Sequence, residues 1–145
     1  GGAVPRVVRP AGGAVMDGPA AHRAFEALRA QFAVIAPQVQ HARLKIVNRR
    51  CAHGDACALR DLAWMQGGDV FLLRRALAHG RDVVRGLLAH ELGHAADPDV
   101  WLPGSEQRAD DIAERATGHR IRYTRRLRVQ TFGPGIYPRP SDLHA

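Results

Sequence analysis

The segment LLAHELGHAAD, residues 87–97, constrains this chain more than any other stretch of its sequence. Its apolar residues recur at helical spacing, yet the same helix must also carry His90, Glu91 and His94. Residues four apart lie on one helix face, so His90 and His94 point the same way. A shuffled chain with eight histidines in 145 residues would contain only about 0.01 motifs of this kind. This low expectation favours a functional site over a solvated face that happens to carry histidines.

The residue types in this motif suit a metal site. Two imidazoles on one helix face can bind a single ion, and neutral imidazole is a preferred ligand of Zn²⁺. Glu91 projects beside that ion, where a general base for a zinc-activated water must stand. Gly93 has no side chain, which leaves room for close packing or for substrate. We therefore expect His90 and His94 to bind zinc and Glu91 to be catalytic.

A catalytic zinc ion needs a third protein ligand and an open fourth position. The downstream candidates are Asp97, Asp99, Glu106, Asp110, Asp111, Glu114 and His119. A ligand six residues after the second histidine is excluded, because that position is Val100, and Asp97 is too close on the same helix end. Glu106 falls in the first turn of a new helix, with Asp110 one turn later on the same face. Glu106 is therefore a better candidate for the third ligand than Asp97.

The rest of the pattern predicts a single α+β domain. With 46% hydrophobic and 24% charged residues, the chain has the composition of a globular protein. Residues 1–18 are rich in Gly, Pro and Ala, which predicts a flexible arm. The domain is expected over residues 19–128, and residues 129–145 are expected to form a Pro-rich tail.

Within that domain, local signals predict the order helix, small sheet, helix, loop, helix. A first amphipathic helix is expected up to Ala36, and a strand over residues 42–48. Gly67 and Gly68 separate two short apolar runs, which predicts a hairpin. Asp82 is the expected N-cap of the histidine-bearing helix. The last helix is expected to be capped by Ser105, to run through Thr117 and to end at Gly118.

The sequence HELGH, followed after a short loop by a glutamate and then an aspartate four residues later, resembles the gluzincin metallopeptidases. Its compact spacing is most similar to that of the minimal ImmA/IrrE-like group, over about residues 42–118. The resemblance implies zinc held by His90, His94 and Glu106, with Asp110 hydrogen-bonded to a ligand histidine.

The same resemblance implies a way of binding substrate. Members of this family have a small, mostly antiparallel sheet whose edge strand lies over the active-site helix and pairs with the substrate backbone. Residues 67–73, GGDVFLL, are in the right sequence position for that strand. The expected substrate-binding residues are Gly68, Asp69, Val70 and Phe71.

The charge of the chain is strongly positive, at +7, and comes almost wholly from arginine because Lys45 is the only lysine. A sequence pI near 10.9 predicts attraction to anionic surfaces such as nucleic acid or a cell envelope. The candidate contacts are Arg122, Arg125, Arg126 and Arg128, although such a run is more often a solvated face. No apolar run is long enough to predict a membrane span.

Cys51 and Cys57 are close together in a loop that contains Gly and Asp. They could form a disulfide, which would indicate a secreted protein, or remain free thiols, which would indicate a cytoplasmic one. The two alternatives carry equal weight. A second metal site at these cysteines is less favoured, because their spacing matches no familiar zinc pattern.

Three functions remain open at this level. The leading one is a zinc-dependent endopeptidase, a hydrolase that cuts peptide bonds with Glu91 as the general base. The second is a zinc-stabilised module that binds a peptide or protein without turnover. The third is a protease directed to nucleic acid or to the cell envelope by its arginine-rich segment. Substrate identity is not encoded in these patterns.

Overall fold

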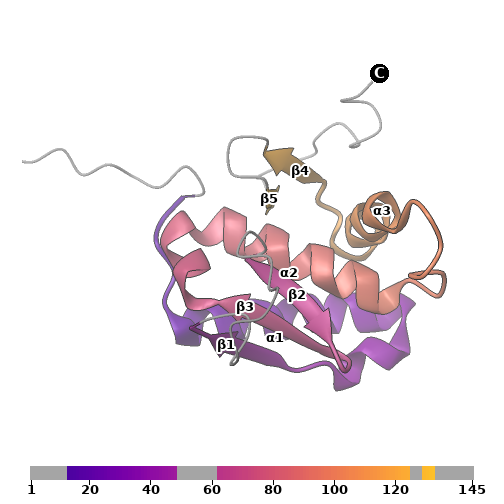
Figure 1. Cartoon of the computed structure of the whole chain (residues 1–145), viewed down its shortest axis with the longest axis horizontal. Helices are drawn as coiled ribbons and strands as arrows, with labels where there is room; N and C mark the ends of the chain where they lie inside the picture. The colour runs from indigo at the N-terminus through magenta and orange to yellow at the C-terminus, as the bar shows by residue number, and fades with distance from the viewer. Residues whose placement is uncertain (1–12, 49–61, 125–128, 133–145) are drawn as a thin grey trace, which may run out of the picture.

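The computed structural model describes residues 13–48, 62–124 and 129–132, which form an α+β fold as expected (Figure 1). The elements are, in chain order, α1 (Gly18–Ile35), η1 (Pro37–His41), β1 (Leu44–Val47), β2 (Ala63–Gln66), β3 (Asp69–Leu73), η2 (Arg74–His79), α2 (Arg81–Ala96), α3 (Ser105–Thr117), β4 (Ile121–Thr124) and β5 (Val129–Phe132). Here η denotes a 3₁₀ helix.

Helix α1 begins at an N-cap that the sequence analysis did not assign. The Oδ1 atom of Asp17 accepts a hydrogen bond of 2.8 Å from the backbone N–H of Ala20, which satisfies one of the free donors of the first turn. The preceding residues were expected to belong to a flexible arm. Instead, Met16 donates its N–H to Leu77, and Ala14 accepts from the N–H of Arg81. The end of the arm is therefore attached to the fold.

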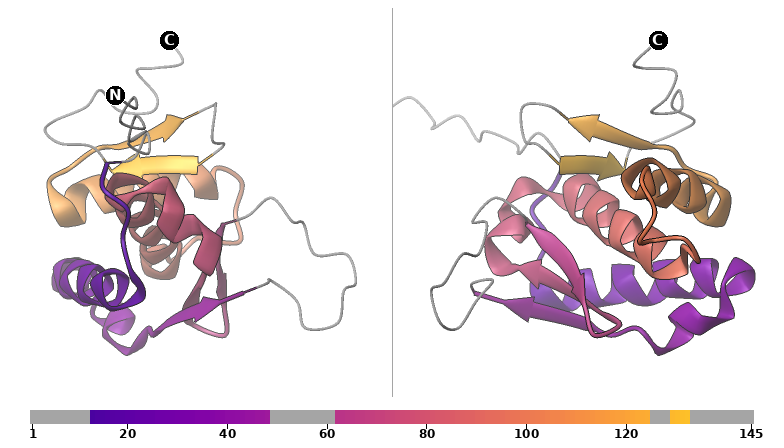
Figure 2. Two further views of the ribbon diagram at one scale, coloured as in Figure 1. Left: turned by 90° about the vertical axis from the view of Figure 1, so that its left-hand side faces the viewer. Right: turned by 45° about the vertical axis from the view of Figure 1, so that its right-hand side comes forward.

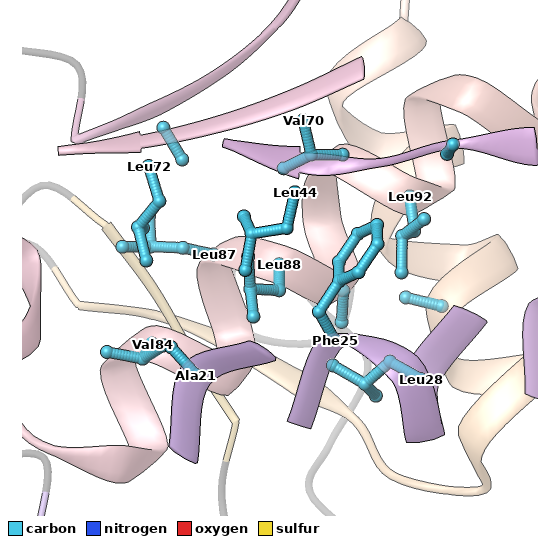
Figure 3. Packing of buried hydrophobic residues seen from close by; sticks show 14 of the residues in the cluster. Ala21, Phe25, Leu28, Leu44, Val70, Leu72, Val84, Leu87, Leu88 and Leu92 are labelled. Atoms are coloured by element: carbon cyan, nitrogen blue, oxygen red, sulfur yellow. The ribbon is translucent and has the colours of Figure 1, made fainter. Parts of the chain in front are cut away.

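The main sheet has the strand order β1-β3-β2, with β1 parallel to β3 and β2 antiparallel to β3. The predicted hairpin is confirmed: Gly67 and Gly68 both have positive φ, 60° and 82°, as a tight two-residue turn requires. One face of this sheet packs on α1 and α2. Figure 3 shows Leu44, Val70 and Leu72 reaching from the strands toward Phe25 of α1 and Leu88 of α2.

The assignment of residues 67–73 to an edge strand is wrong. β3 is the central strand and its backbone pairs with β1 on one side and β2 on the other, so no edge remains for a substrate. The physical reason is that β1 joins β3 across 26 residues of sequence, from Leu44 to Val70, and no local pattern encodes such a pairing. The edge strand that contacts α2 is β2 instead.

The residues expected to bind substrate from β3 have structural roles. Val70 is fully buried in the core, and Phe71 stacks on Trp64 of β2 with ring centroids 5.3 Å apart. A carboxylate oxygen of Asp69 lies 3.2 Å from Nζ of Lys45, and Gly68 belongs to the turn. These four residues therefore lack the free strand edge on which their expected substrate contacts depended.

Helix α2 lies at the centre of the described fold. Figure 2 shows the hairpin of β4 and β5 crossing α2 on the side away from the main sheet, while α1 and α3 contact it elsewhere. β5 falls within the expected tail, so regular structure extends to Phe132 rather than ending at residue 128. Because α2 has neighbours on all these sides, even His90 and Glu91 are buried in it.

The helix ends differ in detail from the sequence expectations. The N-cap of α2 is Gly80, and Asp82 lies inside the first turn, so the cap assignment to Asp82 is wrong. Gly104, in the left-handed region, is the N-cap of α3, and Ser105 is its first helical residue. The end of α3 at Gly118, with φ 72°, is confirmed. No helix in the described ranges is long and apolar enough to cross a membrane.

Candidate metal centre

The motif residues lie in the buried second half of α2. The His90 side chain is only 6% exposed and that of His94 is 13% exposed. Glu91 is also buried, and its negative charge contributes to the raised pKa of His90. Buried polar residues of this kind require partners, because removing them from water is costly. The two histidines find carboxylate partners, Glu106 and Asp110, on α3.

Gly93 explains how α3 reaches the motif. A Cβ atom at this position would lie 2.2 Å from the backbone oxygen of Ala109, which is far inside normal contact. The backbone of α3 therefore packs directly on α2 at this glycine. Figure 1 shows the two helices next to each other. Glu106 and Asp110 flank Ala109 along α3 and are brought to the histidines by this contact. Gly93 serves the close packing of the two helices.

Three side chains, His90, His94 and Glu106, bring possible metal-binding atoms within 4.8 Å of one another. The Nε2 atom of His90 lies 2.8 Å from Oε2 of Glu106 and 3.1 Å from Nε2 of His94. The Nε2 atom of His94 lies 3.2 Å from Oε1 of Glu106. Ligands bound to one tetrahedral zinc at about 2.0–2.1 Å are about 3.3 Å apart. Small outward movements of these donors would therefore admit a metal ion.

Asp110 orients His90 from the opposite side of its ring. The Nδ1 atom of His90 donates a hydrogen bond of 2.7 Å to Oδ1 of Asp110, and both side chains are buried. With its proton held at Nδ1, the neutral imidazole presents the lone pair of Nε2 to the other donors. The Nδ1 atom of His94 is buried and has no hydrogen-bond partner in the described part of the chain.

The charges around His90, His94 and Glu106 favour a positive charge between these three side chains. Burial lowers the pKa of His90, but hydrogen bonds to Asp110 and Glu106 outweigh it and raise the pKa to about 10. The hydrogen bond to His90 lowers the pKa of Glu106 to about 2. Burial and the neighbouring charge of His90 lower the pKa of His94. In the metal-free protein, the proton on His90 thus supplies the positive charge that a bound cation would otherwise provide.

Three of the remaining acidic candidates have partners outside the metal-binding group. Asp97 pairs with Arg108, Glu114 with Arg120, and Asp111 accepts from Gln107. Among the described residues, the metal-binding group contains none of Asp97, Asp99, Asp111, Glu114 and His119. The selection of Glu106 from the candidates thus agrees with where the donors gather. Asp110 and Glu91 adjoin the group without contributing to it.

Several expected sites lie outside the described residues. These are Cys51 and Cys57, with their candidate disulfide, and Arg125, Arg126 and Arg128. Arg122 lies in β4, where only the backbone is described.

Comparisons with protein-family models, with curated proteins and with solved structures returned no match. The two imidazoles and the carboxylate of this centre are therefore the basis for a functional proposal. Such a donor set is compatible with a metal ion, and zinc ions with catalytic roles are held by similar sets.

Proposed function

We propose that this chain is a zinc-dependent endopeptidase of the gluzincin type, similar to the ImmA/IrrE-like proteins. The observation that supports the proposal is the group of three donors at 2.8–3.2 Å, two from α2 and one from α3. A buried Glu91 lies next to this group on the same helix. Two imidazoles and one carboxylate leave a fourth position open, as a catalytic zinc requires.

The roles of the residues follow from their positions. His90, His94 and Glu106 would hold the ion, while Asp110 keeps the imidazole of His90 in the tautomer that binds metal. Zinc bound there would polarise the peptide carbonyl and lower the pKa of water. Glu91 would accept a proton from the attacking water and return it to the amine that leaves when the C–N bond breaks.

The sheet offers a place for the substrate backbone. β2 (Ala63–Gln66) is an edge strand and contacts α2, whereas β3 has both edges occupied. An extended peptide that pairs with β2 would lie along the helix that carries His90 and Glu91. We therefore assign backbone recognition to β2, in place of residues 67–73.

The proposal is tested with Glu91→Gln and a matched control. Both the wild type and Glu91→Gln are expected to hold about one zinc per chain by elemental analysis, because Glu91 is outside the donor group. In a digest of an unbiased peptide library, Glu91→Gln should lose about 10²–10⁴-fold in rate, the usual contribution of a general base. Glu114→Gln, which breaks the ion pair with Arg120 and lies outside the donor group, should still cleave.

Two outcomes would contradict the proposal, the first its mechanism and the second its peptidase activity. Cleavage by Glu91→Gln at the wild-type rate would show that Glu91 is not the base. A fully zinc-loaded wild type that binds peptides but leaves the whole library intact would favour the alternative of a zinc-stabilised binding module. In either case, the metal content and the cleavage rate are measured separately, so a lost metal is not mistaken for lost chemistry.

A further inference from the structure

The loop between α2 and α3 joins two of the three metal-binding residues, because it begins after His94 and ends before Glu106. Its middle is not held by apolar packing. Val100, Trp101 and Leu102 are 45%, 78% and 38% exposed. A loop with so little buried surface needs polar contacts to adopt one conformation.

Arg108 supplies those contacts from the first turns of α3. Its Nε donates to Oδ2 of Asp97 at 3.0 Å, and its Nη1 donates to the carbonyl of Pro103 at 2.6 Å. Its Nη2 donates to the carbonyls of Asp99 and Leu102, at 2.6 and 2.9 Å. One guanidinium thus binds four acceptors spread along the whole loop. Only the planar arginine group offers so many donors in a fixed arrangement.

Both ends of the loop are fixed by the same set of contacts. The carboxylate of Asp97 is almost fully buried, and its other oxygen accepts from the N–H of Asp99 at 2.8 Å. At the far end, the backbone N–H of Arg108 donates to the carbonyl of Gly104, where α3 begins. Gly104 has φ 83°, and an added Cβ would lie 3.3 Å from Nη1 of Arg108. The end of α2 and the start of α3 are therefore tied through one side chain.

Glu106 depends on this tie more than the histidines do. Its side chain is 74% exposed, so packing does not fix its position, whereas His90 and His94 are buried in α2. Its carboxylate reaches both imidazoles only because the first turn of α3 is placed correctly. Arg108 follows Glu106 by two residues in that turn.

We propose that Arg108 is a positioning residue that holds the third metal ligand, Glu106, in place by tying the loop after Asp97 to the first turn of α3. This inference rests on the metal site of the proposed function, but not on peptidase activity. It predicts that zinc affinity depends on Arg108 although the Arg108 guanidinium donates to Asp97 and to loop carbonyls and not to the donor atoms.

The test measures zinc affinity by competition with a chelator. Arg108→Gln is expected to weaken zinc binding by about 10-fold or more, the usual effect of losing a group that orients a ligand. Arg120→Gln is the matched control, because it breaks a comparable ion pair, with Glu114, at the other end of the same helix. The control should lower the Tm but leave zinc affinity unchanged. Equal zinc affinities for the wild type and Arg108→Gln would overturn the proposal.

A double-mutant cycle separates positioning from general destabilisation. In a Glu106→Gln background, Arg108→Gln should change zinc affinity by less than about twofold, because the ligand it positions is already removed. A loss as large as in the wild type would show that Arg108 acts through the histidines or the fold as a whole, and would overturn the proposal. Arg108→Lys should not restore affinity, since one ammonium cannot reach all four acceptors. Full restoration by lysine would contradict the multiple contacts.

If Arg108→Gln does not fold by circular dichroism, Asp97→Asn replaces it. That variant removes the charge of the pair and keeps the three carbonyl contacts of Arg108. Asp97→Asn should also weaken zinc binding, but by a smaller factor than Arg108→Gln. An unchanged zinc affinity would overturn the proposal. Because no peptide substrate is present, these results are independent of whether Glu91 catalyses cleavage.

Discussion

Replacing Gly93 by alanine should destabilise the protein, against the ordinary preference of helices for alanine. In a helix interior, Gly→Ala normally stabilises by about 1 kcal/mol. At this position the added Cβ would meet the Ala109 carbonyl oxygen at 2.2 Å, whereas ordinary contacts begin near 3.4 Å. The two helices would have to separate by about 1 Å at their crossing.

That separation should reduce both the stability of the protein and its affinity for zinc. Overpacking costs roughly 1–3 kcal/mol, and a clash as short as 2.2 Å with a backbone atom places it at the upper end, about 3 kcal/mol. Subtracting the gain of about 1 kcal/mol in helix propensity leaves a net loss of about 2 kcal/mol. For a chain of this length, that corresponds to a decrease in Tm of roughly 6–8 °C. Zinc ligands tolerate displacements of only about 0.2 Å, so moving Glu106 away from His90 should also weaken zinc binding by at least about 10-fold.

Thermal unfolding and chelator competition measure the two effects. Gly18→Ala is the control, because its Cβ would lie 3.8 Å from Cδ1 of Ile46, an ordinary contact, and it should leave both quantities nearly unchanged. A Gly93→Ala protein with a raised Tm and undiminished zinc affinity would refute the close crossing of α2 and α3.

Further expectations concern the groups around the metal. Asp110→Asn should weaken zinc binding by about 10–100-fold in chelator competition, since the partner of His90 is altered, while Asp111→Asn should have no effect. The free energy of unfolding of the metal-free protein should decrease as pH rises from about 6.5 to about 10, by at most about 5 kcal/mol, in denaturant titrations. The free energy decreases because the pKa of His90 is raised in the folded protein. The stabilising charge of His90 is therefore complete below pH 6.5 and is lost when His90 is deprotonated. In the zinc-loaded protein, the free energy of unfolding should not show this decrease. Zinc binding at pH 7–8 should release about one proton from His90, measured by calorimetry in buffers of different ionisation enthalpy.

Local signals in the sequence were sufficient for the three α-helices and the hairpin, but not for the 3₁₀ helices η1 and η2 or for the N-caps of α2 and α3. The first helix, the turn at Gly67 and Gly68 and the end of α3 at Gly118 depend on residues within a few positions of each other. The order of the strands depends on pairing between distant segments. The parallel pairing of β1 with β3 therefore could not be inferred from either strand. For that reason the edge was expected at residues 67–73, which form the central strand.

The sequence predicted the residues of the metal-binding group but not all of the residues that position them. His90 and His94 follow from the four-residue spacing, and Glu106 from its place at the start of a new helix. Arg108 was missed because its acceptors are mostly backbone carbonyls, whose positions exist only after the loop has closed. The reason for Gly93 was also left open between packing and substrate, since the crossing point of two helices is not visible in either sequence segment.

X-ray absorption spectroscopy of the zinc-loaded protein tests the metal centre most directly. The account predicts a four-coordinate ion with nitrogen and oxygen ligands at about 2.0–2.1 Å and the scattering pattern of two imidazoles. In His94→Ala, one imidazole contribution should disappear. Sulfur at about 2.3 Å, which would point to Cys51 and Cys57, or a spectrum unchanged by His94→Ala, would contradict the assignment of His90, His94 and Glu106 as the ligands.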